Sequence, residues 1–310
     1  MAEVVISEFM DEAAVGMISA RHDTVYDPGL VDRPNDLAAA VKGARAIVVR
    51  NRTKVTAALL DQAETLVCVG RLGVGLDNID LAACRARDVA VYPATGANDV
   101  AVAEYVLTTA LSLLRGSYAS SAAVASGAWP RGALMGGEGM DKRLGLVGYG
   151  AIARQVAKRA RVFGFEIAAF DPFLAADDAA WADCRRMELA ELLATSDVVS
   201  LHVPLTDQTR HMIDAAAIAS MKDTAILINT ARGGVVDEAA LADALTAKTL
   251  GGAALDVFET EPLTAEAGAK FAGLSNLILT PHIAGVTVES NVRVSRVTAE
   301  NVLNHLEKSA

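Results

Sequence analysis

The sequence predicts an α/β protein with two Rossmann-like domains, each built on a doubly wound parallel sheet, and three observations support this. The chain has 310 residues, more than one small core requires. Short apolar runs alternate with helical patterns along the chain, which is the rhythm of βαβ units. A glycine-rich turn at Gly148 follows an apolar strand early in a second series of such units.

The first series covers the N-terminal third of the chain. Apolar strands are predicted at 4–7, 46–50, 66–73 and 89–93, with helices at 13–19, 56–64 and 78–87 between them. A longer helix follows at 99–115 and is apolar on most faces, which is typical of a buried helix. A link rich in glycine, tryptophan and proline covers 127–139.

The second series contains six predicted strands. They cover 144–149, 166–171, 198–203, 225–230, 252–257 and 277–282, and an amphipathic helix follows at 287–308. If this helix returns to the first series, the N-terminal domain is discontinuous. We therefore expect one domain of residues 1–96 and 285–310 and another of residues 97–284, with the functional site in the cleft between them.

Composition and charge exclude several classes of protein. Lys and Arg number 28 and Asp and Glu number 38, so the formal net charge is −10, which disfavours binding to nucleic acid or an anionic membrane. No signal peptide is visible, and the most apolar stretch, 100–114, is too short to span a bilayer. Cys68, Cys84 and Cys184 are scattered and show neither a disulfide framework nor metal-ligand spacing, which favours the cytoplasm.

The turn at 148–153 has the pattern of a dinucleotide-binding loop. Gly148 and Gly150 permit a tight turn and a close approach of the backbone to a pyrophosphate, and Ala153 still allows close helix packing. Free N–H groups at the start of the following helix attract the anion. Asp171 ends the next strand, where it can accept from a ribose hydroxyl and repel a 2′-phosphate. The pattern predicts that NAD rather than NADP binds to residues 97–284; the alternative is a tight turn without a ligand.

Three polar residues follow predicted strands of this second domain. Arg232, Glu261 and His282 each lie at or just beyond a strand end. Ligands bind beyond the carboxyl ends of strands in open α/β sheets, so all three are expected to face one crevice. The set fits hydride transfer to a 2-oxo acid, in which histidine supplies the proton and a carboxylate holds the imidazole. The arginine would bind the substrate carboxylate and polarise the carbonyl.

Each of these residues also has a purely structural interpretation. A single histidine after a proline, such as His282, is commonly a turn or packing residue. Glu261 precedes Pro262 and suits an exposed turn, because X-Pro dipeptides favour extended or turn geometry. Arg232 suits the surface of a glycine turn, and Asp256 suits the cap of a strand end. The catalytic hypothesis depends on their joint occurrence behind a dinucleotide loop.

These residues belong to longer segments that resemble the D-isomer-specific 2-hydroxyacid dehydrogenase family. Within the family, the chain is most similar to the D-3-phosphoglycerate dehydrogenases. The resemblance runs almost end to end, and its last three segments are together highly specific. The segments are VRNRTKVT (49–56), GRLGVGLDNID (70–80), the loop at Gly148, NTARGGVVDE (229–238), ALDVFETEP (254–262) and TPHIAG (280–285).

The resemblance implies roles for individual residues. It implies that Arg232 binds the substrate carboxylate, that His282 is the general acid/base and that Glu261 is its partner. It also implies that backbone N–H groups of Val74 and Gly75 bind the substrate carboxylate. The implied contacts with NAD are made by Gly148, Gly150, Ala151, Ile152, Asp171, His202, Val203, Pro204, Thr230, Ala231, Arg232, Asp256, His282 and Gly285.

The resemblance further implies a homodimer, in which the helix at 99–115 and the link after it embrace the partner, and it implies the discontinuous two-domain architecture. On this basis residues 1–96 and 285–310 are expected to bind the substrate. Two features depart from the family. Ala153 replaces the usual last glycine of the loop, which is a tolerable change. The sequence ends at Ala310, so we expect no C-terminal regulatory extension of the kind that some phosphoglycerate dehydrogenases carry.

Basic residues gather near strand ends of the first domain, although the protein is acidic overall. Arg50, Arg52 and Lys54 follow one predicted strand, and Arg71 directly precedes the implied carboxylate loop. Such a cluster indicates a substrate with a second anionic group besides its carboxylate. Phosphate, sulfonate and carboxylate all fit a guanidinium, so 3-phosphoglycerate, sulfolactate and a malate-like acid are all candidates. The alternative interpretation is a solvated edge of the sheet.

Two other functions occur on the same fold. An NAD-sensing co-repressor uses it as a protein-interaction module without turnover. The complete set of Arg232, Glu261 and His282 disfavours this function, as does the lack of a long disordered tail. Formate oxidation is the other alternative, but that family member pairs its histidine with glutamine, whereas Glu261 occupies the position here.

Overall fold

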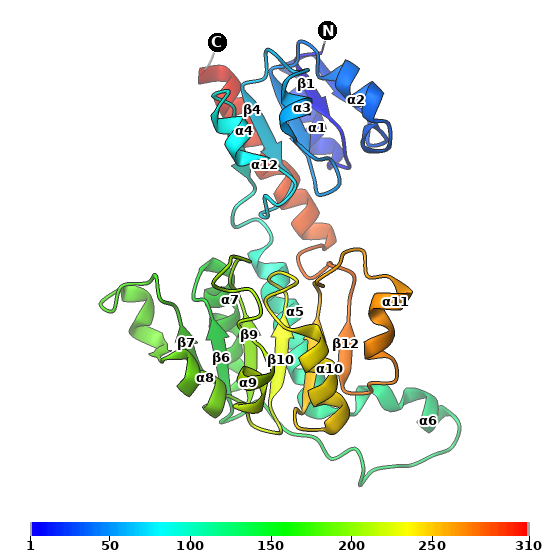
Figure 1. The fold of residues 1–310 in the computed structure, drawn as a ribbon, viewed down its shortest axis with the longest axis vertical. Helices are drawn as coiled ribbons and strands as arrows, with labels where there is room; N and C mark the ends of the chain where they lie inside the picture. Colours follow the sequence, from blue (N-terminus) through cyan, green and yellow to red (C-terminus); the bar gives the residue numbers. More distant parts are fainter. Residues whose placement is uncertain (1, 309–310) are drawn as a thin grey trace. The chain divides into compact units, whose positions relative to one another are not determined.

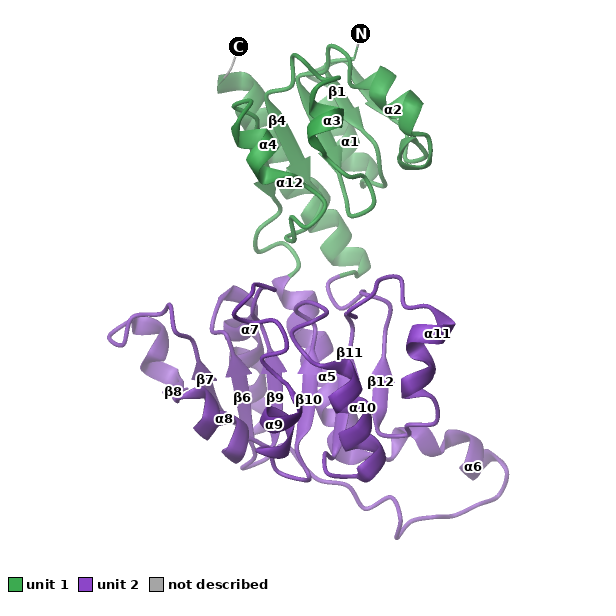
Figure 2. Ribbon diagram, in the orientation of Figure 1, with its two compact units in different colours: residues 1–98, 286–310 green, residues 99–285 purple. Residues whose placement is uncertain are grey.

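The computed structural model describes residues 2–308. Contacts within the chain separate two compact units, unit 1 of Met1–Asn98 and Val286–Ala310 and unit 2 of Asp99–Gly285 (Figure 2). These boundaries lie within two residues of those that the sequence predicts.

Unit 1 contains a parallel five-stranded sheet in the order β2-β1-β3-β4-β5 (Figure 1). Because the chain passes from β1 to β2 on one side and then to β3 on the other, the topological switch point lies between β1 and β3. The strands are β1 (Val4–Ile6), β2 (Thr24–Tyr26), β3 (Ala46–Val49), β4 (Cys68–Arg71) and β5 (Ala90–Pro93). The helices are α1 (Glu12–Ser19), η1 (Leu30–Asp32), α2 (Pro34–Ala40), α3 (Ala57–Leu60), α4 (Leu81–Arg85) and α12 (Val288–Lys308).

The C-terminal helix α12 completes unit 1, so this unit is discontinuous in sequence. It packs against β4, where a Cβ at Gly70 would lie 2.7 Å from Val302 Cγ2 and 2.9 Å from Thr298 Cγ2. Glycine at this position therefore lets the helix approach the strand closely. The amphipathic pattern of 287–308 explains the helix, because its apolar residues, including Val302 and Leu306, are buried.

Unit 2 contains a parallel seven-stranded sheet in the order β12-β11-β10-β9-β6-β7-β8. This is the doubly wound order of dinucleotide-binding domains with one added strand, and its switch point lies between β6 and β9. The strands are β6 (Arg143–Val147), β7 (Glu166–Phe170), β8 (Arg185–Arg186), β9 (Val198–Leu201), β10 (Ile226–Asn229), β11 (Gly252–Leu255) and β12 (Leu277–Leu279).

The helices of unit 2 cover both faces of this sheet. Within residues 2–308, no helix is both long enough and apolar enough to cross a membrane. The α-helices are α5 (Asp99–Arg115), α6 (Ser121–Ala125), α7 (Ala151–Ala160), α8 (Leu189–Thr195), α9 (Ala215–Ala219), α10 (Glu238–Ala247) and α11 (Ala265–Gly268). Short 3-10 turns are η2 (Tyr118–Ser120), η3 (Arg161–Phe163), η4 (Ala179–Asp183) and η5 (Ala269–Phe271).

Two edge strands, β2 and β8, are absent from the sequence prediction. β2 has only three residues, and Val25 at its centre is 38% exposed, so no buried apolar run marks it. β8 consists of two exposed arginines. An edge strand is held by backbone pairing on one side and needs no apolar pattern, which explains why both escaped detection.

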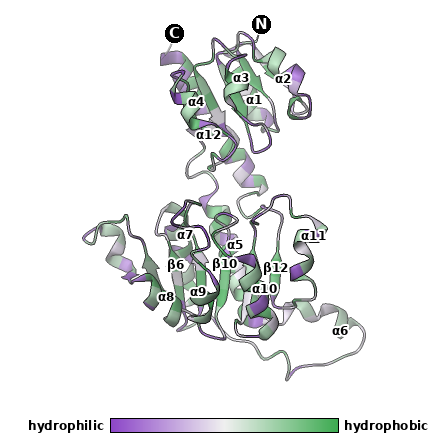
Figure 3. Ribbon diagram, in the orientation of Figure 1, coloured by the Kyte–Doolittle hydropathy of each residue, from purple (hydrophilic) through white to green (hydrophobic). Residues whose placement is uncertain are grey.

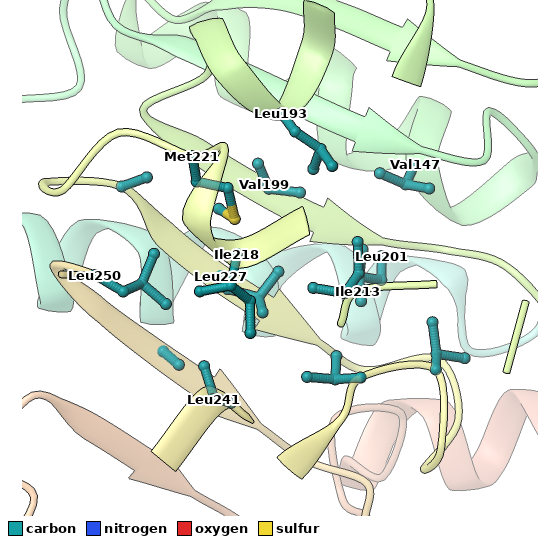
Figure 4. Close-up of a cluster of buried hydrophobic side chains, with 14 of the residues drawn as sticks. Val147, Leu193, Val199, Leu201, Ile213, Ile218, Met221, Leu227, Leu241 and Leu250 are labelled. Atoms are coloured by element: carbon teal, nitrogen blue, oxygen red, sulfur yellow. The ribbon is translucent and has the colours of Figure 1, made fainter. Parts of the chain in front are cut away.

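The core of unit 2 lies on both faces of the sheet. Val199 on β9 and Leu227 on β10 belong to one buried cluster, which Figure 4 shows in part. Their neighbours Val198, Ile226 and Ile228 belong to a second cluster, which α5 and α7 cover. Successive residues of a strand point to opposite faces, so strands buried on both sides are continuously apolar. The hydrophobic colour of the inner strands β6 and β10 in Figure 3 shows this pattern.

Candidate active site

A glycine turn follows β6 at the switch point of unit 2. Gly148 has a φ of 88°, which is unfavourable for a side chain, and a Cβ there would lie 2.6 Å from the carbonyl oxygen of His202. The backbone N–H of Gly148 donates to Phe170 O over 2.8 Å. Only glycine therefore allows the chain to turn between β6 and α7 this close to the end of β9.

The N-terminus of α7 suits a phosphate group. Among the residues that the structure describes, no side chain caps this helix, and nothing lies within 4 Å of a Cβ built on Gly150. Backbone N–H groups at the start of the helix are thus open to an anion, and the helix dipole favours negative charge there. Ala153 is fully buried in the core, as close helix packing requires. The loop fits the pyrophosphate of a dinucleotide.

Asp171 follows β7 and is hydrogen-bonded to the glycine loop. Its Oδ2 accepts from the backbone N–H of Tyr149 over 2.8 Å, and its Oδ1 accepts from those of Phe173 and Leu174. The carboxylate is therefore fixed beside the loop at the end of the neighbouring strand. This is the position at which dinucleotide domains place the acid that binds the ribose.

Two further predicted NAD contacts lie at the ends of central strands. His202 follows β9, and burial lowers its pKa to about 4, so its imidazole is neutral at pH 7. Its Nε2 and Ser200 Oγ are 3.0 Å apart. Thr230 follows β10, and its Oγ1 is buried without a hydrogen-bond partner in the described part of the chain. A buried hydroxyl without a partner is unfavourable, so a polar ligand atom at this strand end would satisfy it.

His282 and Glu261 form a direct pair. His282 Nδ1 lies 2.7 Å from Glu261 Oε2, and Glu261 Oε1 accepts from the backbone N–H of Phe258 over 3.0 Å. A carboxylate accepts only, so Nδ1 carries the proton that binds Glu261. The remaining ring atom, Nε2, is therefore the one that can exchange a proton with a substrate. The His282 side chain is 53% exposed, which leaves it accessible.

The charges of this pair favour a protonated histidine. The hydrogen bond to Glu261 raises the pKa of His282 above its usual range, against the opposing effects of burial and of the Arg232 charge. Burial acts to raise the pKa of Glu261, but the hydrogen bonds from His282 and Phe258 outweigh it and lower this pKa overall. The imidazolium therefore persists to higher pH than that of an ordinary histidine.

Arg232 lies in the same neighbourhood. Its charge lowers the pKa of both Glu261 and His282, which requires proximity. Asn229 holds the turn on which it sits, because Asn229 Nδ2 donates to Arg232 O over 2.9 Å and Asn229 Oδ1 accepts from Ala231 N over 3.0 Å. The structure thus brings together the arginine, the carboxylate and the imidazole that the sequence places on three separate segments.

Asp256 has a structural role that sequence analysis missed. His282 adopts a left-handed conformation with a φ of 56°, which is rare for a residue with a side chain. The Asp256 carboxylate accepts from the backbone N–H groups of Ile283 and Ala284, each over 2.8 Å, and from Thr280 Oγ1 over 2.6 Å. It therefore holds the turn that presents the imidazole. The available sequence signal was an acidic residue at a strand end. The sequence does not show that three hydrogen-bond donors to Asp256 lie in the turn at His282.

The predicted anion-binding residues belong to unit 1. Arg50 follows β3, and its Nη2 donates to Asn291 Oδ1 over 2.7 Å while its guanidinium carbon lies 5.9 Å from the centre of the Phe9 ring. Arg52 is more exposed and pairs with Asp32. Of these two guanidinium groups, that of Arg52 is therefore already engaged by a carboxylate.

Arg71 lies against the loop that the resemblance assigns to the substrate carboxylate. Its Nη1 donates to Leu72 O over 2.6 Å. A Cβ at Gly73 would lie 1.8 Å from this Nη1, so glycine there makes room for the guanidinium. Val74 is 36% exposed, and Gly75 follows it. The side chain of Arg71 thus folds back over Leu72 and Gly73, which directly precede Val74 and Gly75 in the chain.

A parallel sheet with a glycine loop at its switch point, and a carboxylate-bound histidine beyond its strand ends, defines the class of NAD-dependent oxidoreductases. Comparison with known proteins narrows this class. The pattern "D-isomer specific 2-hydroxyacid dehydrogenase, NAD binding domain" matches residues 107–284. The chain belongs to this family, whose members interconvert 2-hydroxy acids and 2-oxo acids with NAD, and it is an enzyme of that kind.

Three relatives illustrate the similarity. The chain is 56% identical over 303 residues to (S)-sulfolactate dehydrogenase of Chromohalobacter salexigens, covering 97% of each protein. It is 39% identical over 259 residues to D-3-phosphoglycerate dehydrogenase of Archaeoglobus fulgidus, covering 84% of this chain and 49% of that protein. The structure of D-lactate dehydrogenase from Aquifex aeolicus with NAD and lactic acid matches with a TM-score of 0.84 and 29% identity, covering 98% of this chain and 96% of that one.

Proposed function

We propose that this enzyme acts at C2 of a small 2-hydroxy acid that carries a second anionic group, with sulfolactate as the first candidate. Two observations support the proposal. Basic side chains at the strand ends of unit 1 suit a second anion, and the similarity to a sulfolactate dehydrogenase covers 97% of each protein. 3-Phosphoglycerate and malate-like acids are the alternatives, because each also carries a second anionic group.

In this proposal each residue has a distinct role. NAD supplies hydride chemistry when bound, with its pyrophosphate at Gly148 and Gly150 and its ribose at Asp171. His282 Nε2 gives a proton to the carbonyl oxygen during reduction and takes it back during oxidation. Arg232 binds the substrate carboxylate and stabilises charge on the reacting oxygen. In unit 1, the backbone N–H groups of Val74 and Gly75 are assigned to carboxylate binding.

The test is NADH oxidation with 3-sulfopyruvate, 3-phosphohydroxypyruvate, oxaloacetate and pyruvate, compared as kcat/KM. We expect sulfopyruvate to give the highest value and pyruvate the lowest. A preference for pyruvate would exclude the second anionic group. A preference for phosphohydroxypyruvate or oxaloacetate would keep that group but change its identity.

Replacement of Arg71 by alanine is expected to raise KM for the preferred dianionic 2-oxo acid about tenfold, because a charge-assisted hydrogen bond is lost. KM for pyruvate should change much less. Arg85→Ala is the matched control, since Arg85 is an exposed arginine on α4 of the same unit. Equal increases in KM for both substrates would show that Arg71 does not contact the second anion.

We propose that the protein is a homodimer formed through the segment 117–140. Figure 1 shows α6 and the loop after it projecting from the sheet of unit 2. Large apolar side chains in this segment are exposed, with Tyr118 at 70%, Trp129 at 75% and Met135 at 86%. Light scattering should give the mass of a dimer, and Trp129→Ser should shift the protein toward the monomer. A monomeric wild type would contradict this assembly.

We also propose that the protein is cytoplasmic. Cys68, Cys84 and Cys184 are free thiols and all are buried. Burial raises the pKa of Cys68 to about 12, so this thiol is unreactive. Cell fractionation with an antibody to the protein tests the assignment.

A further inference from the structure

Glu8 is an acidic residue buried among the basic loops of unit 1. It lies two residues after β1, an inner strand of the sheet, and it is only 5% exposed. The loop after β3 begins at Arg50, so Glu8 and this loop lie on the two sides of the switch point between β1 and β3. Open α/β sheets bind ligands at such a switch point. Here a carboxylate of the chain itself occupies this position.

The Glu8 carboxylate binds three backbone amides of one short loop. Its Oε1 accepts from Arg50 N over 2.8 Å and from Thr53 N over 2.9 Å. Its Oε2 accepts from Arg52 N over 3.1 Å. Convergent backbone N–H groups form an anion-binding concavity, and in this loop Glu8 fills it. An anionic substrate group must therefore be bound by side chains of the loop rather than by these amides.

The charge of Glu8 is stabilised in this position. Burial acts to raise its pKa, but the hydrogen bonds from Thr53, Arg50 and Arg52 lower the pKa overall. Glu8 is thus an ionised carboxylate whose charge is neutralised by backbone donors, and these charge-assisted bonds are stronger than neutral ones. Without these donors, a carboxylate buried to this degree would be unfavourable.

The loop is also held from its other side. Asn78 Nδ2 donates to Thr53 O over 2.6 Å and to Arg50 O over 3.3 Å. Ser7 Oγ and Thr53 Oγ1 are 3.0 Å apart. Side chains therefore fix amides and carbonyls of the loop at 50–53. This fixed backbone sets the position from which the Arg50 side chain extends.

We propose that Glu8 is a positioning residue for substrate specificity: it fixes the loop at 50–53 so that the Arg50 guanidinium is presented to the second anionic group. This inference rests on the proposed function, which assigns that group to the substrate. Glu8 does not touch the substrate in this account. Its effect is to remove the conformational freedom of the loop before binding, so that the substrate does not have to order it.

The variants Glu8→Gln and Glu8→Ala test the role, with Glu12→Gln and Glu12→Ala as matched controls at an exposed acid on α1. Glu8→Gln has nearly the same size, but its amide nitrogen cannot accept from Arg52 N. We expect KM for 3-sulfopyruvate to rise about tenfold in Glu8→Ala and less in Glu8→Gln, with kcat and KM for pyruvate changed less than about twofold. The Glu12 variants should match the wild type.

Hydrogen exchange of the backbone amides at 50–53 gives a readout independent of activity. We expect these amides to be protected in the wild type and in the Glu12 variants, and to exchange faster in the Glu8 variants. If Glu8→Ala does not fold, Glu8→Gln gives both measurements.

The outcomes separate this inference from the proposed function. If the wild type prefers sulfopyruvate but Glu8→Gln keeps both the preference and the amide protection, only the role of Glu8 is wrong. If protection is lost and the ratio of kcat/KM for sulfopyruvate to that for pyruvate stays constant, Glu8 orders the loop without positioning Arg50, which also overturns the inference. A wild type that does not prefer a dianionic substrate overturns the proposed function, and with it this role.

Discussion

Replacement of His282 by alanine is expected to lower kcat about 100- to 10,000-fold, the range that general acid–base catalysis contributes. The reason is that reduction creates an alkoxide at C2, and His282 Nε2 is the atom placed to protonate it while Nδ1 binds Glu261. Steady-state rates in both directions measure the effect. NADH affinity, measured by fluorescence, should fall far less than kcat, because His282 is one of many expected contacts with NAD.

A second histidine provides the control for this variant. His211 also pairs with a glutamate, with 3.1 Å between its Nε2 and Glu259 Oε1, and it lies in the same unit. His211→Ala should keep the wild-type kcat. An equal loss of kcat in the two variants, or a His282→Ala enzyme with full activity, would contradict the role of His282.

Replacement of Glu261 by glutamine is expected to change both the rate and its dependence on pH. Glu261 raises the pKa of His282, so loss of its charge should lower that pKa. Reduction requires the imidazolium and declines as pH rises through this pKa, so the decline should begin at lower pH in the variant. Oxidation requires the neutral imidazole, so its activity should extend to lower pH. We expect kcat for reduction at pH 7 to fall about 10- to 100-fold, since the protonated form is scarcer and the ring is held less firmly.

Profiles of kcat/KM against pH for the wild type and for Glu261→Gln provide the measurement. Glu259→Gln is the matched control, because Glu259 pairs with His211 instead. A profile that keeps its position in Glu261→Gln would mean that another group sets the pKa of the proton donor.

Much of the fold follows from local pattern. The helix predicted at 99–115 has the bounds of α5, and the helix predicted at 287–308 begins one residue before α12. Both carry long apolar periodicities, which are the strongest sequence signal for a helix. The central strands were predicted from continuous apolar runs. Strands that are buried on both faces of a sheet are apolar throughout. The edge strands β2 and β8 have no such pattern, and only the neighbouring strand defines them.

The candidate site, too, was predictable from the sequence only in part. The glycine loop has a local signature, because the turn, the helix start and the acid at the next strand end lie within one βαβ unit. The identities of Arg232, Glu261 and His282 are also visible in the sequence. The sequence predicts that they face one crevice, but their hydrogen bonds and distances depend on the order of strands in the sheet. The role of Asp256 in holding the turn at His282 appears only once its three hydrogen-bond partners are seen.

The sequence by itself therefore determined the two series of βαβ units, the dinucleotide loop and the kinds of side chain that follow the strands. The tertiary structure decided which of those side chains meet. Glu261 and His282 are 21 residues apart and Glu8 and Arg50 are 42 apart, yet each pair is joined by a hydrogen bond. Local periodicity reports burial along one element. A contact between distant residues depends on which strands are neighbours, and parallel pairing brings the carboxyl ends of those strands to the same edge of the sheet.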